Sequence, residues 1–270
     1  MYKSTSISNV FSVTAMFTAF SQTFKSDYSF KGEFHNFWEI VIVLEGKLGV
    51  TAGNSVHILR KGQAILHEPM EFHSLWSEGG TCPKVVIFSF SAENMPSFPS
   101  KTLQLDNLHK PMDILRSMGA VFVMEYGINF VGIKKDAEIS YHIAVKEFEL
   151  FLLSLLNRRA VSSASSLTQS AQNFSKSVSI LEKNLHRNLS VKEIANLCRI
   201  GEVSLKKTFA KYSGMGVMAY FTNMKITAAI QMLKSGMNVS ETASALGFSN
   251  QNYFSTVFKR ITGVSPSYYK

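Results

Sequence analysis

The hydrophobic pattern divides the chain into a strand-rich part followed by a helical part. Between residues 10 and 110, short runs of β-branched and aromatic residues are separated by turn residues such as Gly46-Lys47 and Gly53-Asn54. Many short strands at such close spacing predict a small barrel or a sandwich. We expect strands at Trp38–Leu44, Leu48–Ala52, Val56–Leu59, Ala64–Leu66 and Val85–Phe90, and one or two more within Val10–Phe20.

The period becomes helical after residue 135. Apolar residues recur on one stripe between Asp136 and Arg159, which predicts one long amphipathic helix. The stripe comprises Ile139, Ile143, Phe148, Leu152, Leu155 and Leu156. Such a helix packs either on its own barrel or on a second subunit. Residues 111–134 have no period that decides between helix and strand, and the stretch rich in Ser, Ala, Thr and Gln after Arg159 is typical of a linker.

The C-terminal part contains the same helical unit twice. Ser190-x-x-Glu193 and Asn238-x-x-Glu241 are capping boxes, a device that satisfies free N–H groups at the start of a helix. The two boxes are 48 residues apart, and Gly214 and Gly263, which end the second helix of each unit, are 49 apart. A short helix, a tight turn and a second helix form a helix-turn-helix. Residues 217–235 supply a connecting helix between the two units.

The positive charge is concentrated in this helical part. Of the 270 residues, 28 are Lys or Arg and 19 are Asp or Glu, which gives a net charge of +9. Residues 161–270 hold 13 of the basic residues and 4 of the acidic ones, so the whole excess lies there. A neutral part joined to a strongly basic one favours a module that binds a polyanion, either nucleic acid or a membrane surface.

Composition excludes several other classes. No apolar run approaches the ~18 residues that a membrane span needs, so we do not expect this chain to be an integral membrane protein. The two cysteines, Cys82 and Cys198, argue against a disulfide framework and fit a reducing cytoplasm.

The two helical units share a pattern of residues that is typical of one protein family. In the second unit this pattern lies in the segments 239–243, 246–254, 258–260 and 263–266 and at Tyr269. The first unit fits the pattern at Ile194-Ala195, Leu205, Phe209 and Gly214. With these residues, the C-terminal half resembles the AraC/XylS-type transcription regulators. The N-terminal half is similar, more loosely, to the cupin-type ligand or dimerisation domain of the same family. The positions concerned are His35, Trp38-Glu39-Ile40, Leu44-Glu45-Gly46, Gly62, Pro69 and His73.

The resemblance implies an α+β protein with two domains. It predicts a cupin-like β-barrel with a long dimerisation-type helix at residues 1–160, a linker at 161–173 and an all-α double helix-turn-helix at 174–270. The implied function is a cytoplasmic transcription regulator, more commonly an activator, that binds promoter DNA, works with RNA polymerase and forms a homodimer. Its effector would be a sugar or another metabolite, although some members bind none. We expect no cofactor and no membrane partner.

The second helix of each unit should enter a major groove, the two about one turn of DNA apart. At 100° per residue, one face of each helix is apolar and the opposite face is available for DNA. Gln and Asn can pair with adenine, whereas Lys259 and Arg260 are better placed for phosphates. The residues expected to contact DNA are Val203, Lys206 and Lys207 in the first unit and Gln251, Asn252, Ser255, Thr256, Lys259 and Arg260 in the second.

Four positions depart from the family pattern. Arg199 stands where the first turn often has Gly, and Gly201 replaces the usual Ser cap. Thr256 and Lys225 each stand where Arg is common. We expect these changes to shift the preferred DNA sequence and to leave the fold intact.

The N-terminal part offers an effector pocket and a partial metal motif. We expect the pocket to be lined by Phe34, His35, Phe37, Trp38, Glu39, His73 and Trp76. His35, Glu39 and Gly46 copy part of a metal-cupin motif, but Glu33 stands where its first His should be. His73 could supply another ligand, but buried polar groups that bond to one another are the default explanation, so we predict no metal.

An enzymatic function has little support in the sequence. There is no Gly-rich phosphate loop, no G-x-S-x-G elbow and no Cys pair with zinc spacing, so we expect no catalytic residues. The main alternative is a metal-dependent cupin enzyme fused to a DNA-binding module, and metal analysis with Glu39→Ala and His73→Ala would separate the two. A basic protein of the membrane surface is the third hypothesis, and it predicts liposome binding without DNA sequence preference.

Overall fold

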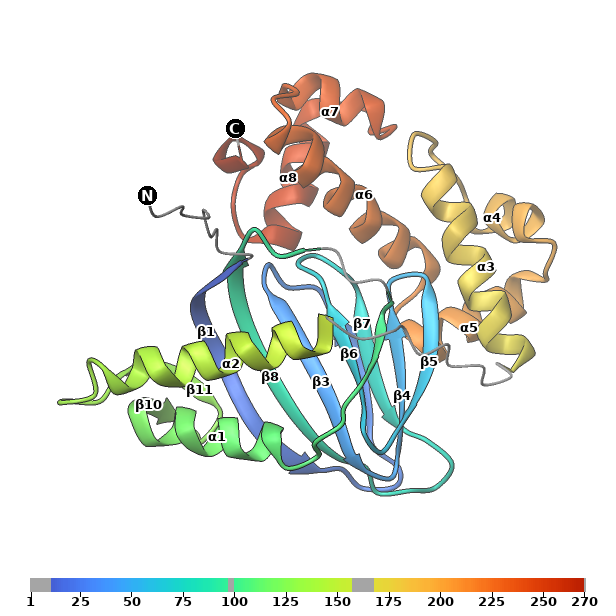
Figure 1. The fold of residues 1–270 in the computed structure, drawn as a ribbon. Helices are drawn as coiled ribbons and strands as arrows, with labels where there is room; N and C mark the ends of the chain where they lie inside the picture. The colour runs from blue at the N-terminus through green and yellow to red at the C-terminus, as the bar shows by residue number, and fades with distance from the viewer. Residues whose placement is uncertain (1–10, 97–99, 157–167, 270) are drawn as a thin grey trace, which may run out of the picture.

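Two β-sheets form the N-terminal part, and a group of helices lies along one end of them (Figure 1). The computed structural model describes residues 11–96, 100–156 and 168–269. The larger sheet has the strand order β10-β11-β1-β8-β3-β6-β9, and the smaller one the order β2-β7-β4-β5. The strands are β1 (Ser12–Thr23), β2 (Ser29–Glu33), β3 (Trp38–Glu45), β4 (Lys47–Ala52), β5 (Ser55–Arg60), β6 (Gln63–His67), β7 (His73–Ser77), β8 (Lys84–Glu93), β9 (Thr102–Gln104), β10 (Phe122–Glu125) and β11 (Asn129–Ile133).

Strand β3 lies at the centre of the N-terminal fold and is buried on both faces. Side chains alternate along a strand, and Val41 and Val43 therefore face the smaller sheet in the core between the two sheets. Ile40 and Ile42 face the opposite way, into a core that two helices cover. This double burial explains why the run from Trp38 is almost continuously apolar, and it confirms the strand that we predicted there.

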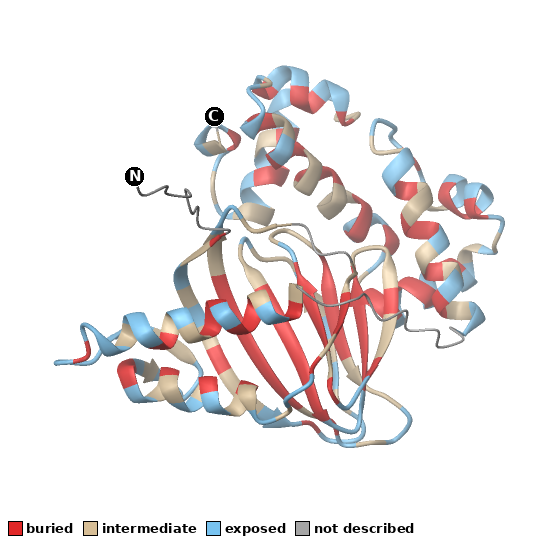
Figure 2. Ribbon diagram, viewed as in Figure 1, coloured by how far each residue is buried: buried red, intermediate tan, exposed pale blue. Residues whose placement is uncertain are grey.

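Helices α1 (Lys110–Val121) and α2 (Ser140–Leu156) cover the outer face of the larger sheet (Figures 1 and 2). Phe148 of α2 packs against Phe88 and Phe90 of β8, with ring centroids 5.0 and 5.1 Å apart. The predicted long helix is confirmed, but its apolar stripe was wrong in part. Ile139 is 77% exposed and Ile143 57% exposed, because at 100° per residue they lie on the face opposite the buried Phe148. The segment left undecided by its period forms α1 and the hairpin β10–β11.

The C-terminal part contains the predicted repeat. Its helices are α3 (Gln169–Lys183), α4 (Val191–Cys198), α5 (Glu202–Ser213), α6 (Val217–Lys234), α7 (Val239–Ala245), α8 (Gln251–Thr262) and the short 3-10 helix η1 (Pro266–Tyr269). Both capping boxes are formed as predicted, at Ser190 with Glu193 and at Asn238 with Glu241. The pairs α4–α5 and α7–α8 are the two helix-turn-helix units, and α6 connects them.

Helix α3 begins within the stretch that we assigned to a linker. Residues 161–167 of that stretch lie outside the described residues. From Gln169 the chain is helical, because the Thr168 hydroxyl caps the helix by accepting a hydrogen bond from the Ala171 N–H at 3.3 Å. Phe174 then packs on Phe209 of α5, with ring centroids 5.2 Å apart. The predicted linker is therefore wrong for its last residues, and α3 packs with the first helix-turn-helix.

The two parts are joined by a shared apolar core and by hydrogen bonds. Phe72, just before β7, packs edge-on against Tyr220 of α6 with ring centroids 5.2 Å apart. The hydroxyls of Thr51 and Ser74 both donate to the carbonyl oxygen of Tyr212, at 2.7 and 2.8 Å. The Tyr220 hydroxyl donates to the carbonyl oxygen of Gly53 at 3.0 Å. The end of α5 and the start of α6 are thus fixed to the smaller sheet.

Candidate DNA interface and effector site

Helix α5 presents the predicted residues of the first unit to solvent. Its inward face is buried at Leu205, Thr208 and Phe209. The opposite face carries Val203, which is 67% exposed, together with the exposed Lys206 and Lys207. Gly201 is the N-cap and supplies no side-chain hydrogen bond there, as expected from its lack of a side chain. The turn before α5 contains Arg199 in the left-handed conformation with φ of 56°. That geometry explains why Gly is common at this position.

Helix α8 presents the second set. Asn250 caps it, because its side-chain oxygen accepts a hydrogen bond from the Tyr253 N–H at 2.8 Å. The buried face consists of Phe254, Val257 and Phe258. Gln251, Asn252, Thr256, Lys259 and Arg260 are exposed, and Ser255 is half-buried. The Thr256 hydroxyl donates to the Asn252 carbonyl oxygen at 3.0 Å. The two faces lie as the helical period predicted; contact of the outer face with DNA stays a prediction.

Lys225 of the connecting helix is buried. Only 6% of the residue is exposed, and its ammonium group lies over the ring of Phe221, 4.8 Å from the centroid. The side chain therefore points into the protein. The expectation that Lys225 shifts the preferred DNA sequence stays a prediction. The sequence analysis placed Lys225 on the connecting helix but did not predict that its side chain is buried.

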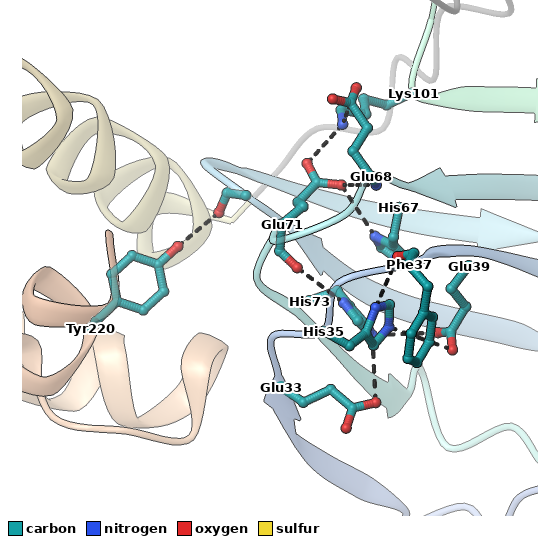
Figure 3. A network of polar contacts seen from close by, with 11 residues as sticks. Glu33, His35, Phe37, Glu39, His67, Glu68, Glu71, His73, Lys101 and Tyr220 are labelled. Atoms are coloured by element: carbon teal, nitrogen blue, oxygen red, sulfur yellow. Dashed lines mark hydrogen bonds and ion pairs between the residues drawn. The ribbon is translucent and has the colours of Figure 1, made fainter. Parts of the chain in front are cut away.

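A cluster of imidazoles and carboxylates lies at the end of the smaller sheet (Figure 3). Glu33, His35, Glu39 and His73 each bring one nitrogen or oxygen atom to within 4.8 Å of the others. His73 Nε2 lies 3.3 Å from Glu39 Oε1 and 3.8 Å from Glu33 Oε1, and His35 Nε2 lies 3.9 Å from Glu39 Oε2. The ring of His67 stacks on that of His73, with centroids 4.3 Å apart.

The electrostatics of the cluster follow from burial and mutual contact. Burial raises the pKa of Glu39, but the close contact with His73 and the nearby imidazoles outweigh it and lower the pKa to about 2. Burial lowers the pKa of His67 to about 4. For His73, burial also lowers the pKa, but the contact with Glu39 is stronger and the net pKa is raised. Glu39 is therefore a carboxylate near neutral pH.

A cavity of about 350 Å³ adjoins this cluster. Five of its twelve lining residues are aromatic and two are aliphatic, and the polar ones are Thr18, Gln22, Glu33, Glu39 and Ser89. The aromatic residues are Phe20, Phe24, Tyr28, Phe30 and Phe37. Four of these were missing from the predicted pocket. Alternation along the first two strands could have indicated Phe20 and Phe30, whereas Phe24 and Tyr28 lie between these strands.

The predicted pocket residues divide into two groups. Phe37 and Glu39 line the cavity, and His35 and His73 contact Glu39. Phe34, Trp38 and Trp76 lie elsewhere. Trp38 packs in the core below α2, Phe34 packs on Phe72, and Trp76 packs on Tyr212 with ring centroids 5.7 Å apart. The reason is strand alternation: Ser74 and Trp76 of β7 face the helices, whereas Leu75 faces the cavity.

Both parts of the chain match models of known protein families. The family model of the AraC-like ligand-binding domain matches residues 16–123, and a helix-turn-helix domain model matches residues 194–270. The regulator YfiF of Bacillus subtilis, described as an uncharacterised HTH-type transcriptional regulator, is 25% identical over 87% of this chain and 77% of its own length. The HTH-type transcriptional activator RhaR of Escherichia coli K12 is 29% identical over 87% of this chain and 85% of its own length.

Other relatives and solved structures match less closely. Further curated regulators match over less than half of their own length. A crystal structure of ToxT from Vibrio cholerae covers 94% of this chain and 97% of its own at 16% identity, with a TM-score of 0.39. None of the described helices is long and apolar enough to cross a membrane. The relatives give no support to the enzyme alternative. The chain belongs to the AraC family of transcription regulators, with an AraC-like ligand-binding domain followed by a helix-turn-helix DNA-binding domain.

Proposed function

We propose that this regulator activates transcription by inserting α5 and α8 into two successive major-groove segments of a promoter. The observation that carries the proposal is the pair of exposed polar helix faces, one in each helix-turn-helix unit, on either side of the connecting helix α6. Helix-turn-helix proteins place such second helices in the major groove about one helical turn apart. Activation is proposed because relatives such as RhaR are named transcriptional activators.

The exposed residues have two kinds of role. Gln251 and Asn252 lie in the first turn of α8, where side chains can reach base edges and pair with adenine. Val203 suits the methyl group of thymine, and Lys206 and Lys207 suit guanine acceptors or phosphates. Ser255 and Thr256 can contact several base edges, and Lys259 and Arg260, in the last turn of α8, bind phosphates.

The effector is a small molecule held in the aromatic cavity beside Glu33 and Glu39. Strand β7 links this cavity to the DNA-binding part, since Leu75 lines the cavity while its neighbour Ser74 bonds to Tyr212. An effector that shifts β7 therefore shifts the end of α5. Such a ligand regulates only if it binds the two arrangements with unequal affinity.

The protein acts as a homodimer through α2. Ile139, Ile143 and Leu150 on or next to this helix are 77%, 57% and 65% exposed, an apolar surface that a second copy would cover.

We assign residues 1–160 to the effector-binding and dimerisation domain. We assign residues 174–270 to the DNA-binding domain, and α3, which begins just before this range, packs with it. Since its target is promoter DNA and its partner is RNA polymerase, we place the protein in the cytoplasm.

The first experiment is selection of bound duplexes from a random DNA pool with purified protein at near-physiological salt. We expect a motif in two parts about one turn apart. Binding without sequence enrichment that weakens steeply with salt would mean phosphate contact alone, and would contradict the proposal.

A further inference from the structure

The two imidazoles of the cluster share an unusual arrangement of their ring nitrogens. His35 Nδ1 lies 2.9 Å from the carbonyl oxygen of Phe37, and His73 Nδ1 lies 3.2 Å from the carbonyl oxygen of Glu71. A carbonyl oxygen can only accept, so each Nδ1 carries the hydrogen and donates it. In a neutral ring the Nε2 atom is then a bare lone pair.

Both Nε2 atoms lie within 4 Å of the Glu39 carboxylate. They are buried, and neither has a hydrogen-bond partner within the part of the chain that the structure describes. His73 is 1% exposed, and its Nε2 nevertheless lies within 4 Å of both Glu33 and Glu39. A buried nitrogen lone pair that faces carboxylate oxygens is unfavourable unless a proton or a cation lies between them.

The Glu39 carboxylate is also held in place by a residue outside the cluster. The Ser89 hydroxyl donates to Glu39 Oε2 at 3.0 Å, and Glu39 Oε1 is the atom nearest to His73. Metal-binding histidines usually donate their second N–H to a carbonyl or carboxylate, and metal-binding carboxylates are usually hydrogen-bonded in turn. Phe37, Glu71 and Ser89 supply these outer contacts to His35, His73 and Glu39.

We propose that Glu33, His35, Glu39 and His73 bind one divalent first-row transition-metal ion. Two imidazoles with two carboxylates suit ions such as Zn²⁺, Mn²⁺, Fe²⁺, Co²⁺ or Ni²⁺ better than Ca²⁺, which prefers oxygen ligands only. Bonds of about 2.0–2.2 Å put ligand atoms at most about 4 Å apart. The four atoms, now within 4.8 Å, need to approach by less than about 1 Å.

This proposal departs from the sequence-based expectation of no metal. That expectation relied on Glu33 in place of a histidine, but Glu33 brings a carboxylate oxygen into the same cluster. The side chain of Glu33 is 49% exposed, so this ligand lies on the solvent side, where an ion can enter. The site goes beyond the proposed function, since binding of a metal requires neither DNA nor an effector.

The test is a titration of the full-length protein, freed of metal by a chelator, with Co²⁺ and then with Zn²⁺. We expect the visible d–d absorption of protein-bound Co²⁺ to saturate at one equivalent, and Zn²⁺ to displace it. His35→Gln and His73→Gln should each lose the saturable signal. Ser89→Ala should weaken binding about 10- to 100-fold, as for other partners of metal ligands.

His57→Gln is the matched control. His57 of β5 also has a buried Nε2 with no hydrogen-bond partner among the described residues, but it is not part of the cluster. This variant should bind Co²⁺ like the unchanged protein. DNA binding reports folding of every variant. Absence of saturable Co²⁺ binding in protein that binds DNA, or equal binding after His35→Gln, would overturn the metal site without affecting the proposed function.

Discussion

The ammonium group of Lys225 donates a hydrogen bond to the carbonyl oxygen of Leu246 at 2.8 Å, and a second one to that of Arg187 at 2.7 Å. Leu246 ends α7, the first helix of the second unit, and Arg187 precedes α4 of the first unit. One buried side chain of the connecting helix thus ties both helix-turn-helix units together. The distance between the two DNA-binding helices depends on this link.

Lys225→Met should loosen the relation between the two units. Methionine keeps the apolar stem but leaves both carbonyl oxygens without this donor, and hydrogen bonds of charged donors contribute about 1.5–3 kcal/mol each. We expect a decrease in the free energy of unfolding of about 3–6 kcal/mol, measured by urea denaturation, and weaker binding to two-part DNA sites.

Lys225→Arg is the control for this change. A guanidinium group retains the charge and offers several N–H donors, so DNA affinity should largely return. Equal stability of the methionine variant and the unchanged protein would show that the two hydrogen bonds do not hold the units together.

Gly247→Ala should be more disruptive than Gly263→Ala. Both glycines have positive φ, 67° and 80°, so alanine is strained at each by about 1–3 kcal/mol. A methyl group at Gly247 would also overlap the carbonyl oxygen of His186, whereas nothing lies near the corresponding position of Gly263. Thermal unfolding should show a larger loss for Gly247→Ala. Similar losses of thermal stability in the two variants would mean that the segment at His186 moves aside at little cost.

Asn252→Ala and Lys259→Ala should affect DNA binding in different ways. If Asn252 pairs with a base, its loss should relax sequence preference at one position and cost about 1–3 kcal/mol on the preferred site only. Loss of a phosphate contact from Lys259 should weaken binding to all sequences and reduce the slope of affinity against salt by about 1. Binding to selected and mismatched duplexes over a range of salt concentrations separates the two, and the exposed Lys176 of α3 provides a charge control.

Much of the fold could be predicted because its signals are local. The capping boxes at Ser190 and Asn238 depend on residues three apart, and the faces of α5 and α8 follow from the helical period. The strand at Trp38 is recognised by its own composition. Each of these features is determined within a few residues of sequence.

The candidate sites depend on contacts between segments that are distant in the sequence, so less of their geometry could be predicted from the sequence. His35 and His73 could be named from a partial motif, but the outer contact from Ser89 becomes visible only when β8 lies beside β3. The burial of Lys225 likewise depends on two carbonyl oxygens far from it in sequence. We predicted Trp76 in the pocket, but it faces the helices. Alternation along a strand shows that successive side chains lie on opposite faces of the sheet, but not which face the helices cover.

Tyr220→Phe should weaken the attachment of the DNA-binding part to the smaller sheet. The change removes the hydrogen bond to Gly53 and keeps the ring contact with Phe72, so we expect a loss of about 0.5–1.5 kcal/mol in the free energy of unfolding. Amide hydrogen exchange in α6 should become faster. Tyr253→Phe, on an exposed residue of α8, is the control, and identical exchange rates in both variants would contradict the prediction.

Metal binding should change DNA affinity, because His73 adjoins the contact between the two parts. Its neighbour Phe72 packs on Tyr220, and the Phe72 carbonyl oxygen accepts from the Gly53 N–H at 2.8 Å. Drawing His73 towards an ion therefore moves both partners of Tyr220. Coupling between two sites typically amounts to 1–3 kcal/mol, or about 5- to 150-fold in affinity. We expect a change of this size between zinc-loaded and metal-free protein on the selected duplex, absent in His35→Gln and reduced in Tyr220→Phe. Unchanged affinity in protein shown to hold zinc would mean that the metal stabilises the barrel without reaching the DNA-binding part.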